Sequence, residues 1–194
     1  YRVMSIIIPD WQIPENIKTL ITTRQGGVSK PPFDSFNLAE HVEDNAYDVQ
    51  CNRHKLLTCL PAAPFWLNQV HSNRVVDAAG VRSVAGMDAD GSYTIEADQV
   101  CAVMTADCLP LLICNRQGTA VAAVHAGWRG LLNGIIEQAV NKVLSAVQCQ
   151  SEDLLVYLGA AIGPEKFEVG EDVRRAFLQR ASDKKKSQDR KSVV

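Results

Sequence analysis

The sequence predicts a single α+β domain built around a mixed β-sheet. The chain has 194 residues, which fits one domain and is too short for two domains of ordinary size. Hydrophobic residues make up 46% of the chain and charged residues 22%, proportions that support a packed globular core. Strand-like and helix-like segments are interleaved without a regular βαβ rhythm, and this irregular order favours a mixed sheet over a doubly wound parallel one.

The first half of the chain is predicted to contain short strands around one helix. A β-branched run at 17–23 indicates a strand that ends in a glycine turn. Asp44 stands where a helix N-cap is expected, and apolar residues at helical spacing predict a helix over 45–60. Segments 65–70 and 74–78 are predicted to pair as a hairpin through a two-residue turn.

The second half predicts more strands and the most regular helix of the chain. Apolar runs indicate strands at 98–105, 109–114, 119–124 and 154–158. Beyond Gly130, apolar residues recur every three or four positions as far as Val147 and predict one long helix. A last amphipathic helix is expected at about 170–180.

Charge and apolar patterning narrow the classes of partner. Lys and Arg total 20 and Asp and Glu total 22, so no strong field favours nucleic acid as a partner. The apolar runs are strand-sized, far below the roughly 18 residues of a membrane span, and the apolar stretch near the start is too short for a signal peptide. Six cysteines occur without a CxxC pair, and we expect a reduced, cytoplasmic setting. The oligomeric state is not predicted.

Three polar side chains stand at breaks between apolar segments, where separate strands could bring them together. They are His71, Cys108 and His125. Two imidazoles and one thiolate suit zinc, and three protein ligands leave a fourth position for water or substrate. A second interpretation makes Cys108 a nucleophile, with His125 as its base and Asp107 or Gln69 as the orienting group. The third alternative is a buried cysteine beside two ordinary histidines. Spacing alone leaves all three open.

Several motifs resemble the YfiH-like laccase-domain family. They are TRQGGVS at 23–29, with Asn37 further on, NQVH at 68–71, TADCLP at 105–110, VHAGWRG at 124–130 and LGAAIGP at 158–164. Together they follow the family order over most of residues 20–178. The resemblance implies a mixed α/β fold that is distantly shared with deamidating toxins that use a Cys–His pair.

The resemblance also implies an activity and a cofactor. In this family the corresponding His, Cys and His bind zinc, which assigns His71, Cys108 and His125 as metal ligands. Members act as purine nucleoside phosphorylases on adenosine, inosine and methylthioadenosine, with adenosine deaminase activity. Older descriptions make them copper polyphenol oxidases, and one bacterial branch corrects peptidoglycan precursors, which implies a Cys–His hydrolase or amidase as an alternative.

The histidine content distinguishes between these chemistries. A multicopper oxidase needs many histidine ligands, typically with His-x-His pairs, whereas this chain has four histidines and no such pair. Copper could still occupy the single site, because it outcompetes zinc in raw affinity. Zinc suits purine deamination better, since it lowers the pKa of bound water to about 7. The resemblance, with which this chemistry agrees, implies purine nucleoside and phosphate as substrates.

Five further residues are predicted to serve this reaction. Asp107 is the candidate for moving protons beside the metal. The guanidinium groups of Arg129 and Arg24 could hold phosphate by paired hydrogen bonds, with Arg129 placed in the catalytic set. Gln69 and Asn37 could hydrogen-bond the base or the sugar. Turn-stabilising roles are the alternative for Asp107, Gln69 and Asn37, and surface roles for the two arginines.

The end of the chain departs from the family pattern. Members usually continue with a Gly-Gly-x-x-Cys-Thr segment and a Ser-Tyr-Arg-Arg motif, and neither is present. We expect residues 1–182 to form one catalytic domain and 183–194 to be a basic tail, mobile or part of an incomplete C-terminus. We also expect that the tail does not continue the helix of 170–180, and that the sequence is a piece of a longer protein.

Overall fold

The computed structural model describes residues 3–79 and 86–191, with side chains described as far as Ser182. A mixed five-stranded sheet in the order β11-β9-β10-β7-β5 forms the centre of the molecule. Its strands are β5 (Val75–Asp77), β7 (Gly91–Thr94), β9 (Leu109–Asn115), β10 (Val121–Ala126) and β11 (Leu154–Leu158). Only the β5–β7 pair is parallel within this sheet. The predicted mixed sheet is therefore confirmed.

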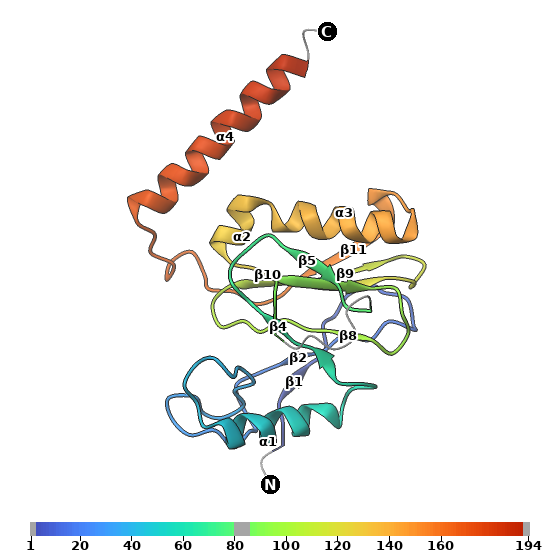
Figure 1. The fold of residues 1–194 in the computed structure, drawn as a ribbon, viewed down its shortest axis with the longest axis vertical. Coiled ribbons are helices and arrows are strands. Elements are labelled where there is room, and N and C mark those ends of the chain that lie inside the picture. The colour runs from blue at the N-terminus through green and yellow to red at the C-terminus, as the bar shows by residue number, and fades with distance from the viewer. Residues whose placement is uncertain (1–2, 80–85, 192–194) are drawn as a thin grey trace.

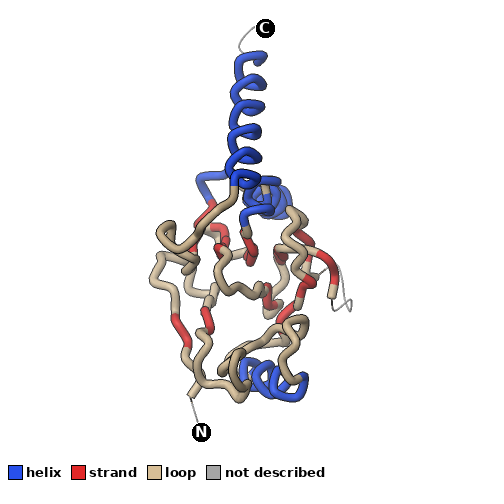
Figure 2. The backbone as a smooth tube through the Cα atoms, turned by 90° about the vertical axis from the view of Figure 1, so that its left-hand side faces the viewer, coloured by secondary structure: helices blue, strands red, loops and turns tan. Residues whose placement is uncertain are grey.

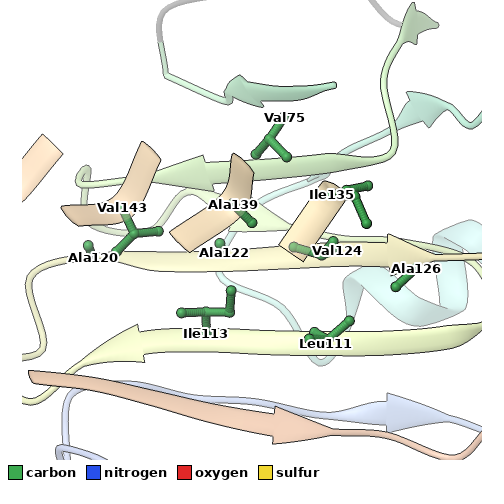
Figure 3. Close-up of a cluster of buried hydrophobic side chains, with 10 residues drawn as sticks. All are labelled: Val75, Leu111, Ile113, Ala120, Ala122, Val124, Ala126, Ile135, Ala139 and Val143. Carbon is green, nitrogen blue, oxygen red and sulfur yellow. The ribbon is translucent and has the colours of Figure 1, made fainter. Parts of the chain in front are cut away.

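Helix α3 (Ile135–Val147) covers one face of this sheet (Figure 1). Its residues Ile135, Ala139 and Val143, spaced four apart, are fully buried on the side that faces β10. Figure 3 shows them above Ala122 and Val124, two alternate residues of one strand face. Three of the residues on this face, Ala120, Ala122 and Ala126, carry only a methyl group, so little side-chain bulk separates the helix from the sheet.

The long helix predicted beyond Gly130 is wrong in one respect, because two helices occupy this stretch. Helix α2 (Trp128–Asn133) ends at Gly134, and α3 begins at the next residue. Gly134 has φ 86°, a left-handed conformation that ends a helix and that glycine adopts without steric cost. Apolar periodicity continues through both helices, so the pattern alone does not reveal the break.

The N-terminal part forms a smaller layer at the opposite end from α3. It contains the antiparallel pair β1 (Ile6–Ile7) and β2 (Ile21–Thr22), and helix α1 (Ala46–Leu57). Figures 1 and 2 both place α1 near the N-terminus, away from α3. Asn45, not the predicted Asp44, caps α1, since its side chain accepts hydrogen bonds from the next turn. Asp44 instead accepts a hydrogen bond from Asn37 at 2.9 Å.

The predicted hairpin of 65–70 with 74–78 does not form. These segments give three short strands that each pair in parallel with a later part of the chain: β3 (Pro64–Phe65) with β8 (Val100–Cys101), β4 (Leu67–Asn68) with β6 (Met87–Asp88), and β5 with β7. The reason lies between them, where the backbone N–H groups of residues 70–72 point to the buried carboxylate of Asp90. These N–H groups are therefore not available for the hydrogen bonds of a hairpin.

Two other boundaries differ from expectation. The strand predicted at 98–105 is reduced to β8, and the helix predicted at 170–180 extends as α4 (Glu171–Lys191). The expectation that residues beyond 182 would not continue this helix is wrong for 183–191, where lysine, arginine and glutamine favour helix and neither glycine nor proline interrupts. Residues 192–194 lie outside the described part of the chain.

Figure 2 shows α4 projecting away from the sheet. Among the described helices, none combines the length and the apolar character needed to cross a lipid bilayer.

Candidate metal centre

The structure brings His71, Cys108 and His125 together at one end of the sheet. Their ligand atoms lie within 4.8 Å of one another, and Cys108 Sγ is 3.9 Å from His71 Nε2. The two imidazole rings meet edge to face, with centroids 4.8 Å apart. Within the described ranges this is the single group of three or more His, Cys, Asp or Glu side chains arranged to hold a metal ion.

Strand pairing explains why these residues meet. His125 is the fifth residue of β10, and its neighbour Ala126 pairs with Leu109 at the start of β9. Cys108, one residue before Leu109, therefore lies beside the point where β10 gives way to α2. His71 comes from the connection between β4 and β5 and has φ 59°, which is uncommon for a residue with a side chain.

A buried carboxylate connects the two histidines. Asp90 is fully buried, and its Oδ1 accepts hydrogen bonds from His125 Nδ1 at 2.8 Å and from the backbone N–H of His71 at 2.9 Å. Its Oδ2 accepts from the backbone N–H and the hydroxyl of Ser72, at 2.6 and 2.8 Å, and from the N–H of Val70 at 3.3 Å. The carboxylate thus joins segment 70–72 to β10.

Exposure and charge differ among the three candidate ligands. His125 is only 4% exposed, whereas His71 and Cys108 are partly open to solvent. Burial, followed by the nearby His125 and Arg129, lowers the pKa of His71. Burial raises the pKa of the Cys108 thiol, and the negative charges of Asp107 and Asp90 act in the same direction. The centre therefore favours a neutral His71 imidazole and needs a cation to stabilise the Cys108 thiolate.

Burial alone would raise the pKa of Asp90, but its hydrogen bonds act in the opposite direction. Those from His125 and Ser72, and the backbone N–H of His71, outweigh burial and hold the pKa below its usual value. Asp90 is therefore ionised at neutral pH. An ionised carboxylate is an acceptor at both oxygens, as the five donors around it require.

The space between the ligands depends on Gly127. A Cβ at this position would lie 2.8 Å from His71 Cδ2 and 3.1 Å from Cys108 Sγ. Both contacts are too close for an unshifted side chain. The VHAGWRG motif thus contributes the candidate ligand His125. Two residues later it places Gly127, whose lack of a side chain leaves room for His71 and Cys108.

The donor set fits one zinc ion. Two nitrogens and one sulfur around tetrahedral zinc are separated by about 3.3–3.6 Å, from bond lengths of about 2.0–2.3 Å. The observed 3.9 Å from Cys108 Sγ to His71 Nε2 is close to this range. His125 also donates its other ring N–H to a carboxylate, as metal-binding histidines usually do. A cation of this kind would offset the thiol's resistance to ionisation.

Two predicted catalytic residues border this cluster. Asp107 precedes Cys108, is exposed, and its backbone carbonyl accepts a hydrogen bond from Ile162 at 2.9 Å. Arg129 lies in the first turn of α2, with its guanidinium 4.3 Å from the centre of the Trp128 ring. Arg129 is exposed and, within the described part of the chain, has no ion-pair partner.

The three predicted substrate-binding residues each form hydrogen bonds with backbone groups of the protein itself. Gln69 forms two hydrogen bonds of 2.7 Å with the backbone of Met104. Asn37 exchanges hydrogen bonds with the backbone of Ala39. Arg24 donates to the backbone carbonyl of Asp34 at 2.8 Å and keeps 70% of its side chain exposed. Neither Gln69 nor Asp107 orients His125, because Asp90 occupies its Nδ1.

Sequence reasoning missed Asp90. The residue stands directly before the small residues Gly91 and Ser92, at the start of β7. The sequence does show an acidic residue at the beginning of a buried strand, but this pattern does not indicate that its partner is His125 on β10. The pairing depends on the antiparallel register of β10 with β7, which the sequence pattern does not specify.

Comparison with known proteins connects this geometry to a family. The family model described as "Multi-copper polyphenol oxidoreductase laccase" matches residues 18–193. Purine nucleoside phosphorylase YfiH of Shigella flexneri is 49% identical over 175 residues, which cover 89% of this chain and 70% of that protein. A purine nucleoside phosphorylase of Pseudomonas aeruginosa is 47% identical over 172 residues, covering 89% of this chain and 68% of its own.

Solved structures show the same fold. A Neisseria meningitidis protein superposes with a TM-score of 0.80 at 45% identity, covering 92% of this chain and 72% of that one. YlmD from Geobacillus stearothermophilus gives a TM-score of 0.72 at 32% identity, covering 80% of this chain and 62% of its own. The match of the family model over nearly the whole chain, together with these relatives, shows that the chain belongs to the YfiH-like laccase-domain family.

Proposed function

We propose that this chain is a zinc-dependent purine nucleoside phosphorylase that acts on adenosine, inosine and methylthioadenosine, with adenosine deaminase activity. The observation that carries the proposal is the convergence of His71, Cys108 and His125 within 4.8 Å. Relatives named purine nucleoside phosphorylase, at 46–49% identity, support the choice of reaction.

Zinc is proposed as the metal because of the ligands and their number. Thiolate with imidazole suits zinc, and a site with three protein ligands leaves one position open for chemistry. Zinc bound there would supply a Lewis acid next to the substrate. Copper could replace zinc at this single site. A laccase reaction needs several copper sites, whereas one cluster is found in the part of the chain that the structure describes.

Arg129 and Asp107 are proposed to act on the substrates. Arg129 presents an exposed guanidinium without an ion-pair partner among the described residues and lies close enough to His71 to affect its pKa. A guanidinium in this position can bind phosphate through two parallel hydrogen bonds. Asp107, exposed beside Cys108, can accept or return a proton on the leaving base.

Arg24, Asn37 and Gln69 are retained as proposed substrate-binding residues. The exposed guanidinium of Arg24 can serve phosphate by the same paired hydrogen bonds. The amides of Asn37 and Gln69 already hold the backbone of Ala39 and Met104. Their contribution to binding would then come through the shape of the loops that they fix.

One observation favours a second function, a Cys–His hydrolase that acts on peptidoglycan precursors. The distance of 3.9 Å between Cys108 Sγ and His71 Nε2 is within reach of a nucleophile–base pair, with His71 as the base in place of the predicted His125. The raised pKa of the Cys108 thiol acts against this function, because a free nucleophile needs a stabilised thiolate. The distant relation to deamidating toxins stays a prediction.

The test follows both proposed reactions in one assay. Adenosine and phosphate give adenine and ribose 1-phosphate, whereas adenosine and water give inosine and ammonia, and chromatography separates adenine from inosine. We expect both activities to need zinc and to be lost in Cys108→Ala but kept in Cys59→Ala, an exposed cysteine elsewhere. Activity that survives complete removal of metal but not thiol alkylation would favour the hydrolase.

We further propose a cytoplasmic setting and small-molecule partners only. All six cysteines are free thiols in the structure, which suits a reducing compartment. A net charge of -2 gives no general attraction to nucleic acid. Fractionation with a tagged chain would test the setting.

A further inference from the structure

We propose that Asp90 is the positioning residue of the metal centre, holding His125 in the tautomer that offers Nε2 to the metal and fixing the backbone that carries His71. The inference rests on the proposed function, because it takes the cluster of His71, Cys108 and His125 as a metal site. It adds a fourth residue that touches no substrate and acts through two of the three ligands.

Asp90 holds the ring of His125 through Nδ1. Asp90 Oδ1 lies 2.8 Å from His125 Nδ1, and a carboxylate can only accept a hydrogen bond. The ring proton must therefore reside on Nδ1, which leaves the lone pair of Nε2 free. His125 is 4% exposed, so bulk water offers its Nδ1 no equivalent partner. The side chain of Asp90 thus determines which nitrogen is available to the metal.

Asp90 also holds the backbone of His71. Three successive N–H groups, of Val70, His71 and Ser72, point to the one carboxylate. His71 itself has φ 59°, a left-handed conformation that is unfavourable for a residue with a side chain. The hydrogen bonds to Asp90 offset that cost and set the direction in which the imidazole leaves the backbone. The same carboxylate thereby fixes ligands from two separate segments.

The backbone of Asp90 strengthens this connection. Its N–H donates to the carbonyl of Arg74 at 3.0 Å, and its carbonyl accepts from the N–H of His125 at 2.7 Å. Side chain and main chain of one residue therefore tie the segment before β5 to the end of β10. A shift of Asp90 would therefore displace both histidines relative to Cys108.

Asp90→Asn is the informative substitution, since it keeps the volume while changing the hydrogen-bond pattern. An amide has one acceptor oxygen and one NH2 group, so it cannot accept from all five donors now around the carboxylate. If its NH2 faces His125, Nδ1 becomes an acceptor and the ring proton moves to Nε2. If its oxygen faces His125, the NH2 opposes the donors of Ser72. Either arrangement impairs the site.

Zinc affinity provides the first measurement. Competition with a chromophoric chelator should show about a 10–100-fold loss for Asp90→Asn, the usual cost of losing a carboxylate behind a metal-binding histidine. Asp88→Asn is the matched control, since it removes the same charge two residues away, where the carboxylate is exposed and accepts from Asn68. A loss of less than threefold is expected there. Equal losses in both variants would overturn the inference in favour of a general charge effect.

The second measurement reads the tautomer directly and does not need metal. Nitrogen-15 chemical shifts of the imidazoles, with His125 assigned from the spectrum of His125→Gln, should show a proton on Nδ1 in the metal-free protein. A proton on Nε2 would refute the inference, even if Asp90→Asn fails to fold. If the wild-type protein binds no zinc, the proposed metal site fails instead, and the tautomer still decides the role of Asp90.

Discussion

At the scale of single residues, Gly127 sets the space available at the candidate metal centre. Its missing side chain leaves the space into which His71 and Cys108 project. For Gly127→Ala we expect zinc affinity to fall at least tenfold, because the new methyl group would push one ligand aside. Unfolding by urea should show a loss of about 1–3 kcal/mol, the range for overpacking a well-filled site.

The control for this variant is Gly163→Ala. No atom lies within 4 Å of the position that a Cβ at Gly163 would take, so zinc affinity and stability should stay close to wild type. Unchanged zinc affinity in Gly127→Ala would mean that the ligands do not converge as described.

At the scale of elements, α1 is attached to the N-terminal loops by one buried amide. Asn52 is 1% exposed. Its Nδ2 donates to Ser29 Oγ and to the carbonyls of Ser35 and Asn37, at 2.9, 3.2 and 2.9 Å. Its Oδ1 accepts from the N–H of Val28 at 3.0 Å. One side chain therefore connects α1 to four polar groups of the N-terminal loops.

Asn52→Ala should accordingly destabilise the protein strongly. Each buried polar group left without a partner costs about 1–3 kcal/mol, and we expect a loss of about 3 kcal/mol in the free energy of unfolding, measured in urea. Asn16→Ala removes an exposed hydrogen bond to the carbonyl of Gly118 and should cost less than about 1 kcal/mol. Similar losses of unfolding free energy in both variants would show that the buried hydrogen bonds of Asn52 contribute no more than an exposed one.

The connection between α2 and α3 is a second element whose conformation can be tested. Gly134 has φ 86°, and a Cβ there would lie 3.1 Å from Arg180 Nη2. Gly134→Ala should lower the free energy of unfolding by about 1–2 kcal/mol, the cost of a left-handed conformation for a residue with a side chain. Thermal denaturation of this variant beside Gly163→Ala would measure the difference. A neutral result would mean that the two helices can merge without cost.

Sequence reasoning predicted elements well where the signal was local. Strands β9, β10 and β11 and helix α1 lie close to the predicted ranges, and α3 ends where the predicted long helix ends, because apolar runs and periodicity report burial. The prediction from sequence is wrong where a residue far away in the chain determines the local conformation. The turn at 70–72 avoids a hairpin because Asp90, eighteen or more positions away, takes its N–H groups. Motifs located His71, Cys108 and His125, but not the residue behind them.

At the scale of the whole molecule, metal binding should be visible as stability. A ligand that binds only the folded state adds about 2.7 kcal/mol when its concentration is 100 times its dissociation constant. We expect zinc to raise the melting temperature of the wild-type chain and a chelator to reverse the rise. Cys108→Ala should lose this increment, whereas Cys59→Ala should keep it. A zinc-dependent rise in Cys108→Ala would contradict the assignment of the thiolate as a ligand.

The layout of the three ligands has a consequence for the order of events during biogenesis. His71, Cys108 and His125 belong to three segments that meet only after β9 and β10 have paired and Asp90 has reached both histidines. Zinc motifs whose ligands are close in sequence can bind the ion while the chain is still unfolded. Ligands as far apart along the chain as these three cannot bind it before the chain folds. The proposed zinc ion should therefore enter a nascent protein late, after the sheet is complete. A cell short of zinc would then accumulate folded, metal-free protein that can still be loaded.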